Sequence, residues 1–66
     1  MQIWINEEPQ EVKDGVTLQG LLNELGVEAA TVVVEKDGAI VARDAFAATT
    51  LSEGNRLELV RFVGGG

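Results

Sequence analysis

A single leucine stripe is the feature that most restricts what this 66-residue chain can fold into. Its apolar residues follow the i, i+3, i+4, i+7 spacing of one helix face, and they are Leu18, Leu21, Leu22 and Leu25. Thr17 stands at the expected N-cap, and Gly26 stands where a left-handed residue closes a helix, with Val27 able to pack back on the last turn. Because such a stripe must be buried, we expect one helix that covers one face of a sheet.

A first β-hairpin is predicted before this helix. Residues 1–6 alternate between apolar and polar side chains, as a half-buried strand does. Residues 7–9 break the alternation, and residues 10–13 form the expected return strand, with Val12 facing inward. Asp14-Gly15 ends the hairpin with residues that tolerate a positive φ.

A second hairpin and a final strand are predicted after the helix. The β-branched run at residues 31–35 and the segment 39–42 are joined by Asp37-Gly38, which favours a type I′ turn. Residues 44–47 allow one helical turn that anchors Phe46 in the core, and the alternating segment 57–63 forms the last strand.

The order of these elements favours one α+β architecture. If the last strand lies in the centre of the sheet and parallel to the first, Leu57 and Leu59 join Ile3, Ile5 and the leucine stripe in one core. The result is a β-grasp (ubiquitin-like) fold, with a mixed sheet of four to five strands and one main helix packed on one face. We expect a domain of residues 1–63 followed by a flexible glycine tail, residues 64–66.

The glycine tail is the candidate reactive segment. The sequence contains no Cys and no His, which excludes thiolate nucleophiles, the commonest zinc ligands and the usual general base. Glycines lack a Cβ and can enter a channel too narrow for a side chain. The Gly66 carboxylate is therefore the candidate site of covalent chemistry, and Gly64 and Gly65 form the slender arm that carries it.

Charge and hydropathy narrow the classes of partner. Eleven acidic against five basic residues give a net charge of −6, which argues against nucleic acid and favours basic protein surfaces. No apolar run approaches the roughly 20 residues that span a bilayer, and no signal peptide is recognisable, so we expect a cytoplasmic protein without membrane contact. Glu7, Glu8 and Glu11 lack the spacing of a calcium site, so no metal is expected.

A protein-binding patch is predicted on the uncovered face of the sheet. If Leu57 and Leu59 face the helix, then Glu58, Val60 and Phe62 face the other way. Trp4 falls on the same face, on the neighbouring strand. Aromatic residues are enriched in interface cores, so Trp4, Val60 and Phe62 are the candidate partner-binding residues.

The whole chain resembles the ThiS family of thiamine-biosynthesis sulfur carriers, through its opening residues 2–6, the Thr17-Leu18 and Leu21-Leu22 pairs, and above all the closing segment 53–66. The resemblance implies a co-substrate without bound cofactor, not an enzyme, that is a monomer when free. An E1-like adenylating enzyme would use MgATP to activate Gly66, and a sulfur donor such as a cysteine desulfurase would convert it to a thiocarboxylate. Thiazole synthase would take up the sulfur.

Three alternatives share parts of this pattern. The small subunit of molybdopterin synthase would have the same fold, adenylation step and terminal glycines, although the Phe62-Val63-Gly64 approach to the tail favours thiamine. A ubiquitin-like modifier would form isopeptide bonds with lysines of other proteins. A pure interaction module would not depend on Gly66 at all.

Overall fold

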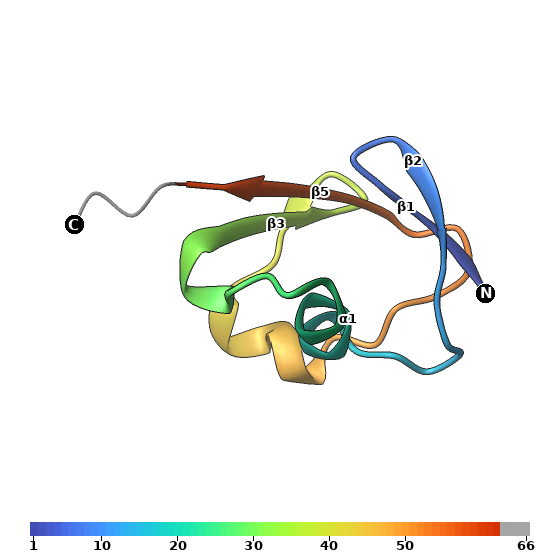
Figure 1. Cartoon of the computed structure of the whole chain (residues 1–66), viewed down its shortest axis with the longest axis horizontal. Helices are drawn as coiled ribbons and strands as arrows, with labels where there is room; N and C mark the ends of the chain where they lie inside the picture. The colour runs from blue at the N-terminus through green and yellow to red at the C-terminus, as the bar shows by residue number, and fades with distance from the viewer. Residues whose placement is uncertain (63–66) are drawn as a thin grey trace.

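The computed structural model describes residues 1–62. Five strands form one sheet in the order β2-β1-β5-β3-β4, and one α-helix lies against one face of it (Figure 1). β1 and β5 run parallel, and the other neighbouring pairs are antiparallel. In chain order the elements are β1 (Gln2–Ile5), β2 (Glu8–Glu11), α1 (Leu18–Leu25), the 3-10 helix η1 (Ala29–Thr31), β3 (Val32–Lys36), β4 (Ala39–Ile40), the 3-10 helix η2 (Arg43–Ala48) and β5 (Arg56–Arg61).

The central position of β5 confirms the predicted β-grasp fold. β5 lies between β1 and β3, with Ile5 opposite Leu57 in the parallel pair and Val34 opposite Leu59 in the antiparallel pair. The last strand thereby pairs with the first strand on one side and with β3, from the middle of the chain, on the other. The predicted boundary between a domain of 1–63 and a tail of 64–66 falls on residues outside the described part of the chain.

The caps of α1 are those that the sequence predicts. The Thr17 Oγ1 accepts a hydrogen bond of 3.0 Å from the Gly20 N–H. Gly26 has a φ of 71°, its N–H donates to the Asn23 carbonyl, and the Val27 N–H donates to the Leu22 carbonyl at 2.9 Å. This pair of bonds is the Schellman motif, which satisfies the last carbonyls of the helix.

The fourth leucine of the predicted stripe does not join the core. Leu18, Leu21 and Leu22 are buried, but Leu25 is 43% exposed. Because the chain reverses at Gly26 directly after Leu25, Val27 packs against the core in its place. The prediction of a stripe that ends in Leu25 is therefore wrong at its last residue.

The first hairpin begins its return earlier than predicted. Asn6 and Glu7 form the turn with φ values of 50° and 67°, and β2 starts at Glu8 rather than at residue 10. Pro9 lies opposite Trp4 on the edge strand. The Val12 N–H donates to the Met1 carbonyl, so Met1 and Val12 form a hydrogen-bonded pair. Hydrogen-bonded and non-hydrogen-bonded pairs alternate along an antiparallel ladder, which makes Trp4–Pro9 a non-hydrogen-bonded pair. The missing N–H of proline therefore costs no hydrogen bond of the ladder.

The second hairpin follows the prediction at its turn. Asp37 and Gly38 have φ values of 50° and 87°, which a type I′ turn requires. β4 spans only Ala39–Ile40 of the predicted 39–42, although the Val41 N–H still donates to the Val34 carbonyl at 2.9 Å.

One apolar core lies between the inner face of the sheet and α1 with η2. Phe46 on η2 is 1% exposed, which confirms its predicted role as an anchor. Ile5 and Leu59 are half-buried and pack at the margin of the core rather than in its centre. The buried residues are Ile3, Leu18, Leu21, Leu22, Val32, Val34, Phe46, Leu51 and Leu57.

Candidate functional site

β5 holds the chain firmly up to the last described residue. Its Arg61 pairs with Val32 on β3, and beyond the strand the Phe62 N–H donates to the Thr31 carbonyl at 3.0 Å. The backbone is thus anchored to the sheet as far as Phe62. The predicted covalent site, Gly66, and its arm, Gly64 and Gly65, lie outside the described residues.

Asn6 secures the other side of β5 where β1 has already ended. β1 pairs with β5 at Trp4–Arg56 and Ile5–Leu57, and beyond Leu57 no strand residue within the described range 1–62 lies opposite β5 on that side. The Asn6 Oδ1 accepts from the Leu59 N–H at 2.8 Å, and its Nδ2 donates to the Leu59 carbonyl at 3.4 Å. A side chain therefore takes the place of the next strand residue. The sequence alone does not indicate this role of Asn6, because the role depends on a contact between residues 53 positions apart.

An apolar surface lies on the sheet face opposite α1, and we call its four residues the open-face patch: Val33, Ile40, Val60 and Phe62. Val33 lies directly opposite Val60, and both are exposed, with Val60 at 58%. Ile40 on β4 is 70% exposed and Phe62 is 46% exposed. Val60 and Phe62 were predicted for this face, but Val33 and Ile40 were not. The alternation within residues 31–35 contained the signal for Val33, because it points every second residue outward.

Trp4 shares this face but not this patch. It is half-buried and lies beside Arg56, whose guanidinium carbon is 5.2 Å from the centre of the indole ring. That distance is within the range of a cation–π contact. Val60 lies four residues further along β5, or roughly 13 Å away at the rise of a strand. The structure therefore brings Val60 together with Val33, and it stacks Trp4 on Arg56 instead.

Two carboxylates separate these two zones. Glu35 and Glu58 lie directly opposite each other on β3 and β5, and the alternation places both on the open face, next to the Val33–Val60 pair. Ile40 is the β4 neighbour of Glu35. Along β5 the open face thus presents Arg56, Glu58, Val60 and then Phe62, so positive, negative and apolar zones follow one another toward residue 63.

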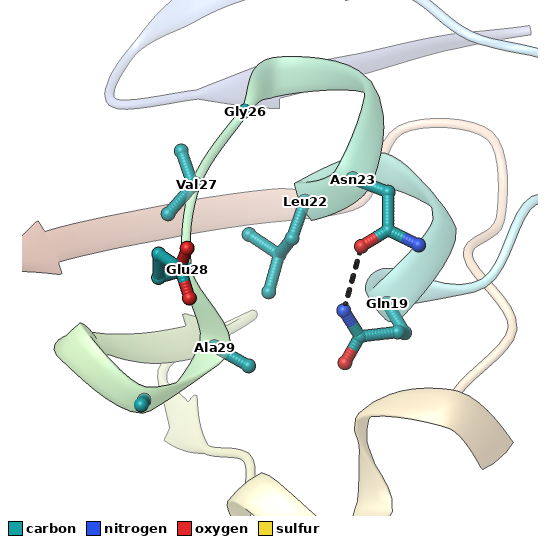
Figure 2. A pocket seen from close by; sticks show the side chains of 8 residues that line it. Gln19, Leu22, Asn23, Gly26, Val27, Glu28 and Ala29 are labelled. Atoms are coloured by element: carbon teal, nitrogen blue, oxygen red, sulfur yellow. Dashed lines mark hydrogen bonds between the residues drawn. The ribbon is translucent and has the colours of Figure 1, made fainter.

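A hollow of about 390 Å³ lies on the helix side, between α1 and the segment that leads to η1 (Figure 2). Its wall includes Leu22, Val27 and Glu28, and the Gln19 Nε2 donates to the Asn23 Oδ1 across 3.0 Å. Its lining mixes the polar side chains of Gln19, Asn23 and Glu28 with apolar ones. It is on the opposite side of the sheet from the open-face patch.

Metal ligands do not gather anywhere in residues 1–62, where no three Asp or Glu residues lie close enough to hold an ion. In that same range no helix is long and apolar enough to cross a membrane. The features that remain for a functional site are the root of the glycine tail and the open sheet face beside it.

Comparison with known proteins identifies relatives of the whole chain. The model of the ThiS family matches residues 3–66. The crystal structure of the thiamine biosynthesis protein ThiS from Geobacter metallireducens is similar, with a TM-score of 0.85, 36% identity and complete coverage of both chains.

Two curated relatives are much longer proteins. Thiazole synthase from Magnetococcus marinus is 42% identical to this chain over 66 residues, and thiazole synthase from Paramagnetospirillum magneticum is 38% identical over the same length. The match covers all of this chain and 20% of each relative. The chain therefore spans about a fifth of the length of these two proteins.

Proposed function

This chain belongs to the ThiS family, whose members are small sulfur carriers rather than enzymes, and we propose that it carries sulfur in thiamine biosynthesis on a thiocarboxylate at Gly66. The observation that carries the proposal is the family match itself. It runs over residues 3–66, so it includes the glycine run as well as the fold.

Activation comes first in the proposed chemistry. A carboxylate is ionised at neutral pH and is a poor acyl electrophile. An E1-like enzyme supplies MgATP, the Gly66 carboxylate oxygen attacks the α-phosphorus, and pyrophosphate leaves. The product is an acyl adenylate with AMP as a good leaving group. Gly64 and Gly65 let the arm enter that active site, because they carry no side chain.

Sulfur loading and delivery follow. A donor such as a cysteine desulfurase presents the sulfur as a persulfide, whose outer sulfur attacks the acyl carbon, so that a C–S bond forms and the C–O bond to AMP breaks. A reducing thiol then attacks the donor's inner sulfur, the S–S bond of the acyl disulfide breaks, and the thiocarboxylate is released as the thiol and the donor form a disulfide and a proton is released. Thiazole synthase then accepts the sulfur. The two long relatives support this last partner, since a segment like this chain forms a fifth of proteins that are named thiazole synthase.

The geometry supports a carrier of this kind. β5 is paired with β3 as far as Arg61, and the Phe62 N–H donates to the Thr31 carbonyl, so the sheet gives the arm a rigid base. The open-face patch ends at that base and offers a docking surface to the enzymes that work on the arm. Trp4 is still proposed to contact a partner enzyme, although it lies beside Arg56 and outside the open-face patch.

Intact mass spectrometry tests the proposal. The chain is incubated with an E1-like adenylating enzyme, MgATP and sulfide, and we expect one oxygen to be replaced by one sulfur at Gly66. A variant with one alanine added after Gly66 is the matched control. It should fold equally well and stay unmodified, because the reacting carbonyl is displaced.

Two results would contradict the proposal. One is an unmodified parent chain beside an enzyme that modifies another carrier in the same mixture. The other is a ladder of conjugates to lysines of other proteins, which a ubiquitin-like modifier would produce.

A further inference from the structure

The Glu35–Glu58 pair is an unfavourable arrangement for the isolated domain. In an antiparallel pair joined by hydrogen bonds, directly opposite Cα atoms are about 5.5 Å apart, and like charges at such positions are destabilising. Among residues 1–62 neither carboxylate forms an ion pair. Arg56, which the alternation of β5 places on that face, lies over Trp4, and Lys36 contacts Asp37.

The Glu35–Glu58 pair lies beside the apolar residues of the open-face patch, so its charges matter to any protein that binds there. On its own strand Glu58 lies between Val60 and Arg56, whose guanidinium lies over Trp4, and Glu35 is flanked by Val33 and by Ile40 on β4. A protein that covers the open-face patch must cover the two carboxylates as well. Burying two unpaired negative charges under an apolar surface is strongly unfavourable, because each ion loses its hydration. A partner for this face must therefore bring a cation to that spot.

We propose that thiazole synthase docks on the open-face patch and places one arginine or lysine side chain between Glu35 and Glu58. The inference rests on the proposed function and adds to it the chemistry of the contact. The apolar residues of the patch exclude water around the ion pair, which strengthens it. The two carboxylates together select a basic partner and reject one that presents only apolar or acidic groups.

We assign thiazole synthase as the partner because a segment homologous to this chain lies within proteins of that name. The acidic balance of the chain, eleven acidic to five basic residues, adds attraction toward a basic docking surface.

Binding and stability measured side by side test the inference. Glu35→Gln and Glu58→Gln are compared with Glu24→Gln, which removes the same charge from α1 on the other side of the sheet. Dissociation constants for thiazole synthase are measured by calorimetry at two salt concentrations. Each open-face variant should bind about tenfold more weakly and lose part of the salt dependence, and Glu24→Gln should bind like the parent.

The thermal midpoint separates a docking role from a structural one. Both open-face variants should unfold at the parental temperature or up to about 8 °C higher, because they remove like-charge repulsion. Glu58→Lys should also raise the midpoint, while it abolishes binding by opposing the partner's cation. A purely structural role would move stability and binding in the same direction.

Equal binding by the parent and both open-face glutamine variants would overturn the inference, and so would an equal loss in Glu24→Gln. Either result would leave the proposed function in place as long as Gly66 still gains sulfur. A parent chain that never gains sulfur beside an active adenylating enzyme would instead overturn the proposed function.

Discussion

Replacing Asn6 with alanine tests how the sheet keeps β5 in place. Asn6 has a φ of 50°, which asparagine tolerates and alanine does not, at a cost of about 1 kcal/mol. The substitution also removes the 2.8 Å bond from the Leu59 N–H, worth about 0.5–1.5 kcal/mol. The second contact, at 3.4 Å, is too long to add much. Asn6→Ala should therefore lower the free energy of unfolding by about 1.5–2.5 kcal/mol.

Thermal unfolding followed by circular dichroism measures this loss. For a domain of this size 1 kcal/mol corresponds to about 4–8 °C, so the midpoint should fall by about 6–20 °C. Asn6→Gly removes only the φ penalty and should recover part of the loss. Asn6→Asp keeps an acceptor for the Leu59 N–H and should be closest to the parent, in high salt that screens the added charge. A parental midpoint for Asn6→Ala, or an equal loss in Asn6→Asp, would refute the reasoning.

Three further substitutions have defined outcomes. Leu22→Ala should cost about 2–5 kcal/mol because Leu22 is fully buried, and Leu25→Ala, its exposed control on the same helix, should cost well under half of that in denaturant titrations. Glu7→Gly should raise the thermal midpoint by about 2–8 °C, since Glu7 holds a φ of 67° that glycine adopts without strain. Val60→Ser should weaken binding to thiazole synthase in calorimetry while stability changes by no more than about 0.5 kcal/mol, and unchanged binding would exclude Val60 from the docking surface.

The helix and the topology could be predicted because their signals are local and agree with one another. Thr17, the leucines and Gly26 specify the start, the buried face and the end of α1 within ten residues. Because one helix covers one face of a single sheet, the apolar residues of the last strand reach the core when that strand lies in the centre. β5 occupies this central position. The residue types of Asp37 and Gly38 likewise predict the turn that these two residues form.

The missed features depend on residues far apart or of unusual type. The Asn6–Glu7 turn contains no glycine, and Pro9 suggested a break where an edge strand in fact tolerates it. The separation of Trp4 from Val60 follows from the register of β1 on β5, which places Trp4 opposite Arg56. Alternation alone gives the face of a side chain but not its position along the neighbouring strand.

The composition of the open face was foreseen only in part for the same reason. Val60 and Phe62 belong to the last strand and were assigned to the uncovered face directly. Val33 and Ile40 join them only once the register of β3 with β4 and β5 is known, and the same register brings Glu35 to Glu58.

Transfer of labelled sulfur tests the central claim most directly. The chain is loaded at Gly66 with an isotopically labelled sulfide, purified and mixed with thiazole synthase and the remaining substrates of that enzyme. The account predicts that the carrier returns to its carboxylate mass while the label appears in the small-molecule thiazole product. Label that stays on Gly66, beside an enzyme that accepts the thiocarboxylate of another carrier, would contradict it.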